Sequence, residues 1–352
     1  MRGMRWIGRL AALAWIAALP AAAQPRLFSE QTPLHFEITA PFSKIAQGKY
    51  TGKTPYPATL SLTDTASPQT FPIELRARGY TRRTAGYCSF PPLSLKFEKK
   101  SAHGSVFQGQ HRLKLVTYCR PMPDYEQRVI LEYTAYRLYN LITPISFQVR
   151  AAQVTYRSSD ADAGVTRFGY LIEDAGDVAD RNHREVLTAP PRQLAAAQLD
   201  PHAAARAALF EFMIGNLDWD FLAGPAGLDC CHNSRPIAAP GAKPADAKGI
   251  TPLPYDFDYS GFVDSPYAGP PEGIPVSSLT ERYYRGYCVS TGEVAAVIDE
   301  YRARHADMMA VINGEARLTP KFRDKTVGYM DAFFALLDDP ARVQREIVKH
   351  CR

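Results

Sequence analysis

Carboxylate and amide side chains form three short clusters in the second half of this chain. Asp218 comes first, Asn233 follows a histidine, and Asp256 and Asp258 flank a phenylalanine. A phosphoryl-transfer site needs its groups in this order: a carboxylate that orients the attacking hydroxyl, an amide that binds a metal, and a carboxylate that holds Mg²⁺ against the phosphates. The clusters therefore predict Asp218 as the hydroxyl-orienting base and Asn233, Asp256 and Asp258 as metal ligands.

The pair Asp256 and Asp258 gives the clearest reason to expect a metal. Residues two apart at the end of a strand project on the same face, and we expect a strand at residues 253–257. Two carboxylates this close repel each other unless a cation or a shared proton lies between them, and oxygen ligands suit Mg²⁺ or Mn²⁺. The competing interpretations are a structural Ca²⁺ site or a solvated turn. For Asp218 and Asn233 they are a helix end and a surface turn.

The first 23 residues have the pattern of an export signal. Arg2, Arg5 and Arg9 precede an apolar run of ten residues at positions 10–19, and three alanines follow it. Such a run is too short to cross ~30 Å of hydrocarbon. We expect residues 1–23 to be cleaved, the mature protein to be periplasmic or secreted, and no transmembrane segment to remain.

The charge of the chain excludes one class of partner. The formal net charge of +5 includes the three arginines of the signal segment, so the mature protein is near neutral. Nucleic-acid binding usually requires a basic domain or a basic stripe. We therefore expect no nucleic-acid partner.

The chain has six cysteines. An even number in an exported protein predicts disulfides formed in an oxidising compartment, whereas zinc would favour CxxC pairs, which the sequence lacks. Cys88 and Cys119 lie on or beside neighbouring strand-like runs, so we expect them to pair. The adjacent residues Cys230 and Cys231 are each expected to bond to a distant partner.

Hydrophobic periodicity divides the mature chain into a β-rich part, residues 24–175, and a helical part, residues 176–352. We expect a helix from Asp124, as its N-cap, to Thr143, and another after the cap pair Asp200-Pro201. Later helices are expected at residues 293–312 and 320–349. Strand-like alternation covers residues 34–40, 56–62, 71–78, 93–97, 112–117, 147–156 and 168–172.

Further short motifs precede the three acidic and amide clusters. They are RARGY at 76–80, LSLKF at 93–97, LKL at 113–115, the helix at 126–141 and FGYLIE at 168–173. Together with the clusters, this order resembles the spore-coat protein H kinase family of atypical exported protein kinases. The resemblance implies an α+β, divergent two-lobed protein-kinase-like fold with a β-rich N-terminal lobe and a mainly helical C-terminal lobe. It also implies binding of ATP with Mg²⁺ or Mn²⁺.

A kinase-like site also needs groups that hold the nucleotide. Lys96 is expected to contact the phosphates and to pair with Glu132 of the helix, whereas Lys114 is expected on a solvated face. Glu173 would begin a segment that connects the lobes and accept hydrogen bonds from adenine or ribose, unless it lies in a solvated loop. The arginines between residues 76 and 83 would hold phosphates or an acidic substrate, or would form an exposed hairpin.

Three functions remain open from the sequence. The first is an exported kinase-like protein that binds nucleotide and divalent metal and phosphorylates a protein or a small hydroxyl substrate. The second is an inactive pseudokinase or an envelope assembly protein, which would be favoured if the insertion at residues 223–231 carried a disulfide over the site. The third is a metal-dependent hydrolase that uses the same carboxylates to activate water and does not need Lys96 and Glu132 together.

Overall fold

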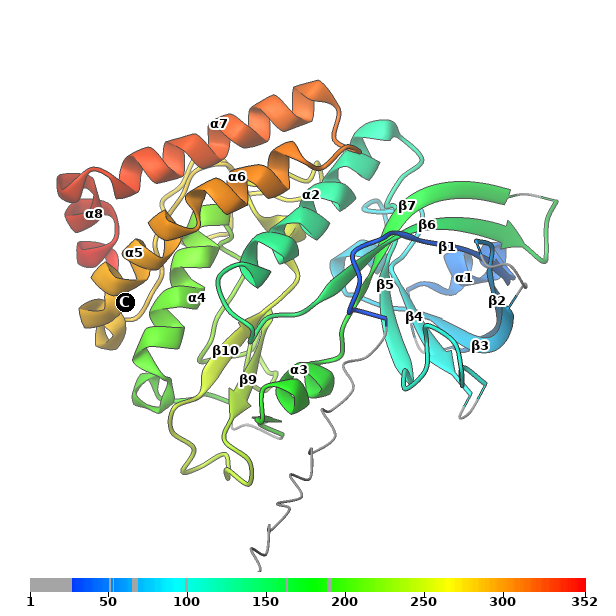
Figure 1. The fold of residues 1–352 in the computed structure, drawn as a ribbon, viewed down its shortest axis with the longest axis horizontal. Helices are drawn as coiled ribbons and strands as arrows, with labels where there is room; N and C mark the ends of the chain where they lie inside the picture. Colours follow the sequence, from blue (N-terminus) through cyan, green and yellow to red (C-terminus); the bar gives the residue numbers. More distant parts are fainter. Residues whose placement is uncertain are drawn as a thin grey trace, which may run out of the picture.

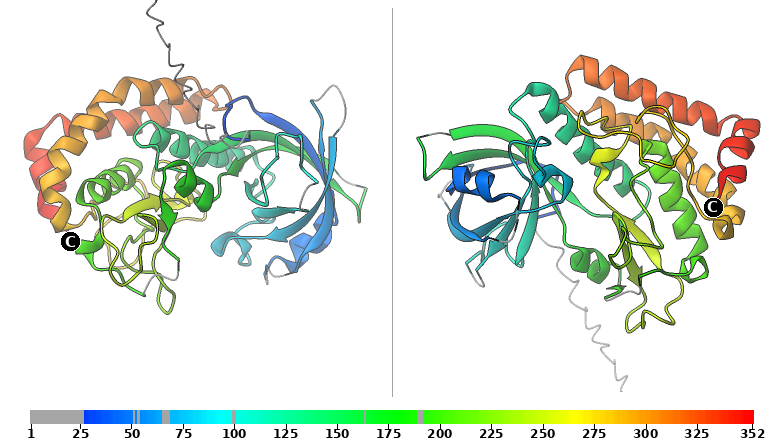
Figure 2. Two further views of the ribbon diagram at one scale, coloured as in Figure 1. Left: turned by 60° about the horizontal axis from the view of Figure 1, so that its bottom comes forward. Right: turned by 180° about the vertical axis from the view of Figure 1, so that it is seen from behind.

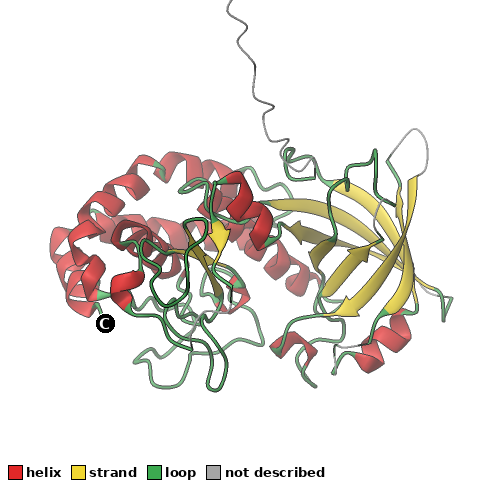
Figure 3. Cartoon of the chain, turned by 90° about the horizontal axis from the view of Figure 1, so that it is seen from below, coloured by secondary structure: helices red, strands yellow, loops and turns green. Residues whose placement is uncertain are grey.

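The computed structural model describes residues 27–352 except 51, 53, 65–68, 99–100, 163 and 189–191. The predicted signal segment, residues 1–23, lies outside the described residues. The strands of the N-terminal part gather at one end of the molecule and the larger helices at the other (Figures 1 and 3). Helix α8 lies at the end opposite the β-structure in both views of Figure 2.

Seven strands close into a mixed barrel in the order β1-β2-β3-β4-β5-β7-β6. The strands are β1 (Leu34–Ala40), β2 (Tyr56–Leu62), β3 (Gln69–Ala77), β4 (Leu93–Phe97), β5 (Arg112–Val116), β6 (Val149–Ser158) and β7 (Gly164–Ile172). Neighbours are antiparallel except β1 and β6, which pair in parallel from Leu34 opposite Ala152 to Ala40 opposite Ser158. This parallel pairing closes the barrel.

The expected α+β, divergent two-lobed protein-kinase-like fold is therefore wrong. The predicted strand positions agree with the seven strands to within a few residues, but the closed mixed barrel is not the expected architecture. Alternation of apolar and polar residues shows which segments are strands and which face is buried. It does not show that the first strand pairs with the sixth, since that pairing depends on the whole sheet.

Aromatic rings fill the inside of the barrel. Phe107, from the loop between β4 and β5, is fully buried. Its ring centroid lies 5.1 Å from that of Phe97, 5.6 Å from that of Phe71 and 6.4 Å from that of Phe36. The loop thus contributes a central core residue, because interiors of small barrels are filled by side chains.

The helices and a small second sheet make up the rest of the fold. The helices are α1 (Phe42–Gly48), α2 (Pro123–Asn140), α3 (Ala175–Arg181), α4 (Pro201–Ile214), α5 (Val294–Ala303), α6 (His305–Asn313), α7 (Pro320–Leu337) and α8 (Pro340–Glu346). The second sheet has the order β10-β9-β8, with β8 (Glu185–Val186), β9 (Ser234–Ala238) and β10 (Thr251–Pro254).

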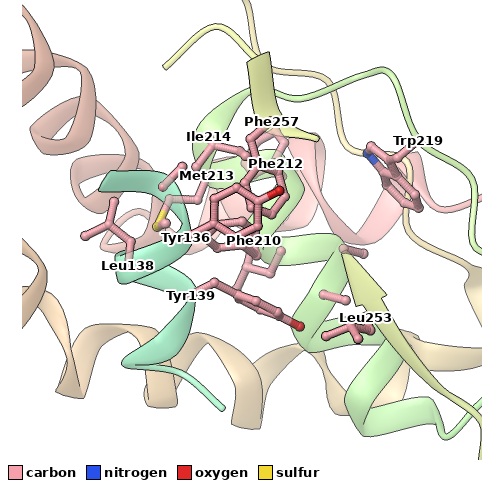
Figure 4. Packing of buried hydrophobic residues seen from close by; sticks show 14 of the residues in the cluster. Tyr136, Leu138, Tyr139, Phe210, Phe212, Met213, Ile214, Trp219, Leu253 and Phe257 are labelled. Atoms are coloured by element: carbon pink, nitrogen blue, oxygen red, sulfur yellow. The ribbon is translucent and has the colours of Figure 1, made fainter. Parts of the chain in front are cut away.

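Helix α2 joins the barrel to the helical part. One side of α2 packs against β6 and β7 and another against α6. Figure 4 shows its residues Tyr136 and Tyr139 among the aromatic side chains of α4 and of the segment after β10. The ring of Tyr139 lies 4.4 Å from Phe210, and that of Tyr136 lies 4.6 Å from Phe257. These contacts fix the position of α2, which carries Glu132.

Two N-cap residues were predicted from the sequence, and the structure confirms one of them. Asp200 caps α4 as predicted, because its carboxylate accepts a hydrogen bond of 2.8 Å from the amide of Ala203, with Pro201 at the first helical position. The cap predicted at Asp124 is wrong. Helix α2 begins at Pro123, and its N-cap residue Met122 has no side-chain hydrogen bond to the helix.

Three disulfides occur in the described part of the chain: Cys88–Cys119, Cys230–Cys231 and Cys288–Cys351. The predicted pair Cys88–Cys119 is confirmed. The expectation that Cys230 and Cys231 bond to distant partners is wrong, since they bond to each other. Three disulfides are consistent with an extracellular or periplasmic location. Among the described helices, none is both long enough and apolar enough to cross a bilayer.

We expect Phe107→Ala to lower the free energy of unfolding by about 3–5 kcal/mol, because it leaves a cavity where a buried ring meets three others. Chemical denaturation followed by circular dichroism would measure this change. Tyr50→Ala is the matched control, since the Tyr50 side chain is exposed and its loss should cost little. A loss below about 1 kcal/mol for Phe107→Ala would show that the ring is not part of a closed barrel core.

Candidate functional site

A cavity of about 730 Å³ lies between the barrel, α2, the segment that leads from α4 into β9, and the segment that follows β10. The barrel side contributes Arg78 and Lys114, and α2 contributes Glu132. The later part of the chain contributes polar residues that include Asp218, His232, Asn233, Asp256 and Asp258. All four residues predicted from the three clusters thus line the same cavity.

Three carboxylates meet on one wall of this cavity. Glu132, Asp256 and Asp258 can each place an oxygen so that all three lie within 4.8 Å of one another. Glu132 and Asp258 are buried, at 3% and 6% exposure. Burial raises the pKa of both carboxyls, and the neighbouring carboxylates raise it further, while the nearby Arg82 guanidinium opposes the shift. Such a group requires protons or a bound cation, and its oxygen ligands would suit Mg²⁺ or Mn²⁺.

The backbone that brings Asp256 and Asp258 to Glu132 is not a strand. β10 ends at Pro254, Asp256 has a left-handed backbone with φ 68°, and Asp258 lies in the short 3₁₀ helix η3 (Phe257–Tyr259). The expectation that Asp256 and Asp258 alternate along a strand end is therefore wrong. Tyr136, one turn after Glu132 on α2, accepts a hydrogen bond of 2.9 Å from the amide of Asp256.

Asp218 is held by two neighbours from the segment before β9. The distance from its Oδ1 to His232 Nε2 is 2.8 Å, and Asn233 Nδ2 donates to its Oδ2 at 3.0 Å and to its backbone carbonyl at 2.7 Å. The hydrogen bond with Asp218 raises the pKa of His232. Because Asn233 donates through its nitrogen, its amide oxygen remains available as a metal ligand. The carboxylate of Asp218 retains acceptor capacity for a substrate hydroxyl.

The cavity also contains three cationic side chains, those of Lys114, Arg235 and Arg78. Lys114 Nζ lies 5.6 Å from the Phe147 ring centroid and 5.5 Å from that of Tyr255, and Arg235 lies 5.4 Å from Tyr255. Burial lowers the pKa of Lys114 to about 8, and the positive charges of Arg78 and Arg235 contribute to this shift. Within the described part of the chain, no ion pair is formed by any of the three cations. Like charges in a partly buried site are unfavourable unless an anion balances them.

Lys96 and Glu173 do not join this cavity. Lys96 Nζ lies 3.8 Å from Glu74, and both residues line a separate groove on the barrel. Glu173 is buried, forms an ion pair with Arg181 at 2.9 Å, and accepts a hydrogen bond from the amide of Gln148. The structure therefore brings Glu132 together with the metal-ligand candidates but does not bring Lys96 to Glu132.

Lys114, and not Lys96, lines the cavity together with Glu132. It lies on β5 opposite Ile172 of β7, and its partly buried side chain lines the cavity between the barrel and the helical part. The predicted solvated face for Lys114 is wrong. Val116 and Ile172 place apolar side chains on the same outer face, and the pairing of β5 with β7 brings Ile172 next to Lys114.

The arginines between residues 76 and 83 have separate roles. Arg76 forms an ion pair with Glu74, and Arg83 donates to the backbone carbonyls of Lys49 and Tyr50. Arg82 is buried and donates to the carbonyl of Thr117 at 2.6 Å. The side chain of Arg78 lines the cavity, and its positive charge lowers the pKa of Lys114. The cluster is therefore neither an exposed hairpin nor a single phosphate site.

Comparison with known proteins adds no assignment. The chain matches no family model, and no curated protein is significantly similar to it in sequence. The resemblance to the spore-coat protein H kinase family therefore stays a prediction that rests on the short motifs alone.

Proposed function

We propose that the cavity binds a nucleoside triphosphate, ATP in the first instance, with Mg²⁺ or Mn²⁺ and transfers a phosphoryl group to a hydroxyl of a protein or a small molecule. One observation carries this proposal. Three carboxylates that repel one another share a cavity with three cations that form no ion pair in the described part of the chain. A metal–triphosphate complex satisfies both groups at once. The resemblance to exported atypical kinases supports the same activity, without the fold it implied.

The chain's residues then have distinct roles. Glu132, Asp256, Asp258 and the amide oxygen of Asn233 would hold the metal, which when bound neutralises charge on the phosphates. Lys114, with its neighbouring arginines, would bind phosphate oxygens through charge-assisted hydrogen bonds.

Asp218 acts on the acceptor. It accepts a hydrogen bond from the acceptor hydroxyl and orients that oxygen towards the terminal phosphorus. A new P–O bond forms to the acceptor, the bond to the nucleoside diphosphate breaks, and the hydroxyl proton passes to Asp218. The three disulfides support the predicted periplasmic or secreted location for this reaction.

A second function, nucleotide binding without transfer, is favoured by one feature. The disulfide Cys230–Cys231 and the preceding residues Pro225, Ala226 and Leu228 line the cavity. A bonded loop at this place restricts access of a large acceptor. An inactive binding protein or assembly factor would keep the metal and nucleotide site but would not depend on Asp218.

We expect Lys114→Ala to weaken binding of Mg-ATP by roughly tenfold or more, because it removes a charge-assisted hydrogen bond to phosphate. Lys96→Ala is the matched control and should bind as the wild type does. Thermal unfolding with and without Mg-ATP measures the difference, since ligand at a hundred times its Kd stabilises the folded state by ~2.7 kcal/mol. Equal thermal shifts in the two variants would contradict the phosphate site at Lys114.

We expect Asp256→Asn to raise the melting temperature in EDTA, because one of three mutually repelling carboxylates loses its charge. The same variant should lose most of the further rise that Mg²⁺ or Mn²⁺ produces in the wild type, because a metal ligand has lost its charge. Differential scanning fluorimetry measures both effects. A metal-induced rise that is the same in variant and wild type would place the ion elsewhere.

We expect Asp218→Asn to lower kcat for phosphoryl transfer by about 10²–10⁴-fold, as is typical when a general base is removed, while the Kd for Mg-ATP stays within about twofold. Transfer of radiolabelled phosphate from ATP to protein and to water measures turnover, with Asp246→Asn, an exposed carboxylate, as the control. Transfer to water alone would identify a hydrolase. Binding without any Asp218-dependent turnover would identify the binding protein.

A further inference from the structure

A continuous set of contacts connects the Cys288–Cys351 disulfide to Asp218. We propose that Arg352, fixed in place by this disulfide, positions Asp218 through Asp220 and His232, so that the site is organised for transfer only when the disulfide is formed. The proposal rests on the phosphoryl-transfer function proposed above. It gives Asp220 and Arg352 the role of positioning residues, because neither lines the cavity.

The first step runs from Asp220 to Asp218. The amide of Asp220 donates to the carbonyl of His232 at 3.0 Å, and the amide of His232 donates back to the carbonyl of Asp220 at 3.0 Å. This pair forms an isolated antiparallel bridge. The ring of His232 then meets the carboxylate of Asp218 at 2.8 Å. A shift of the Asp220 backbone therefore moves the histidine that holds Asp218.

The second step concerns the carboxylate of Asp220. Its Oδ1 accepts hydrogen bonds from the amides of Leu222 at 2.8 Å and Ala223 at 3.0 Å, and from the hydroxyl of Tyr287 at 3.1 Å. Its Oδ2 accepts one from Arg352 at 3.0 Å. Arg352 is thus the single cation bonded to this carboxylate in the described part of the chain.

The third step fixes Arg352 itself. Residue Cys351 is bonded to Cys288, and the amide of Arg352 donates to the carbonyl of Gly286 at 2.9 Å while its carbonyl accepts from the amide of Cys288 at 3.1 Å. The guanidinium of Arg352 lies 5.5 Å from the ring of Trp219 and 5.0 Å from that of Tyr287. The disulfide therefore holds the arginine over the segment between Asp218 and Asp220.

This segment depends on such contacts because it has little regular structure of its own. Residues 215–219 lie after the end of α4 and outside any helix or strand, and β9 begins only at Ser234. Arg285 also holds this segment, because it donates hydrogen bonds to the carbonyls of Leu217 and, at 3.0 Å, Trp219. A misplacement of a reacting group by about 1 Å can cost on the order of 100-fold in rate.

Reduction of the Cys288–Cys351 disulfide would loosen this set of contacts. A dithiol reductant would transfer two electrons and two protons to Cys288–Cys351, which breaks the S–S bond into two thiols while the reductant becomes a disulfide. Residues 351–352 would then be held by hydrogen bonds, ring contacts and the ion pair of Arg352 with Asp220. An oxidising compartment keeps the bond formed.

The test compares Arg352→Gln, Arg352→Lys and the control Arg345→Gln in the oxidised protein. Arg345 is exposed and pairs only with Glu346 in the described contacts. We expect Arg352→Gln to lower kcat with Mg-ATP by about ten- to a hundredfold while KM for ATP stays within about twofold. Arg352→Lys should recover part of the loss, and Arg345→Gln should match the wild type. An unchanged kcat in Arg352→Gln, or a rise in KM alone, would overturn the proposal.

The double variant Cys288→Ser with Cys351→Ser should show the same loss of kcat, and a dithiol reductant should have no further effect on it through this bond. Hydrogen exchange separates this proposal from the function on which it rests. If the wild type transfers no phosphate, phosphoryl transfer is wrong. Positioning is then decided by the amides of Asp220 and His232: exchange at least about tenfold faster in Arg352→Gln supports it, and unchanged exchange overturns it.

Discussion

The buried carboxylate of Glu132 is the constraint around which the rest of this structure is arranged. It projects from the middle of α2, the helix that packs against the barrel on one side and against the helical part on the other. A buried charge costs several kcal/mol unless it is paired or neutralised. Asp256 and Asp258 increase this cost, and Arg82 reduces it only in part. A helix in this position could have carried an apolar residue, and the presence of a carboxylate there supports the proposed metal site.

Two of the three cations of the cavity come from the barrel, whereas the third, Arg235, comes from β9. The barrel contributes Arg78 and Lys114, whereas Asp218, Asn233, Asp256 and Asp258 all follow α4. Neither part has a complete site by itself. The aromatic contacts of α2 with Phe210 and Phe257 therefore do more than stabilise the fold. They determine the distance between the group that would bind phosphate and the groups that would bind metal.

Much of the site could be predicted from the sequence, for reasons that are local. Acidic residues close together in the chain, such as Asp256 and Asp258, remain close in space whatever backbone they adopt, and strand alternation identified the strands of the barrel. The remaining features depend on distant pairings. The parallel pairing of β1 with β6, the choice of Lys114 over Lys96, and the ion pair of Glu173 with Arg181 all follow from which surfaces cover one another. Periodicity does not contain that information.

Two of the proposed metal ligands have a backbone that few residues tolerate. Asn233 and Asp256 both have positive φ, 49° and 68°, and the amide of Tyr255 next to Asp256 donates to the carbonyl of Asn233 at 3.0 Å. Asn and Asp adopt this left-handed region more readily than other residues with a side chain. Each position must therefore meet a conformational and a chemical requirement together. Over evolutionary time these two sites can exchange Asn for Asp at little conformational cost, whereas most other replacements would distort the loop and remove the ligand in the same step.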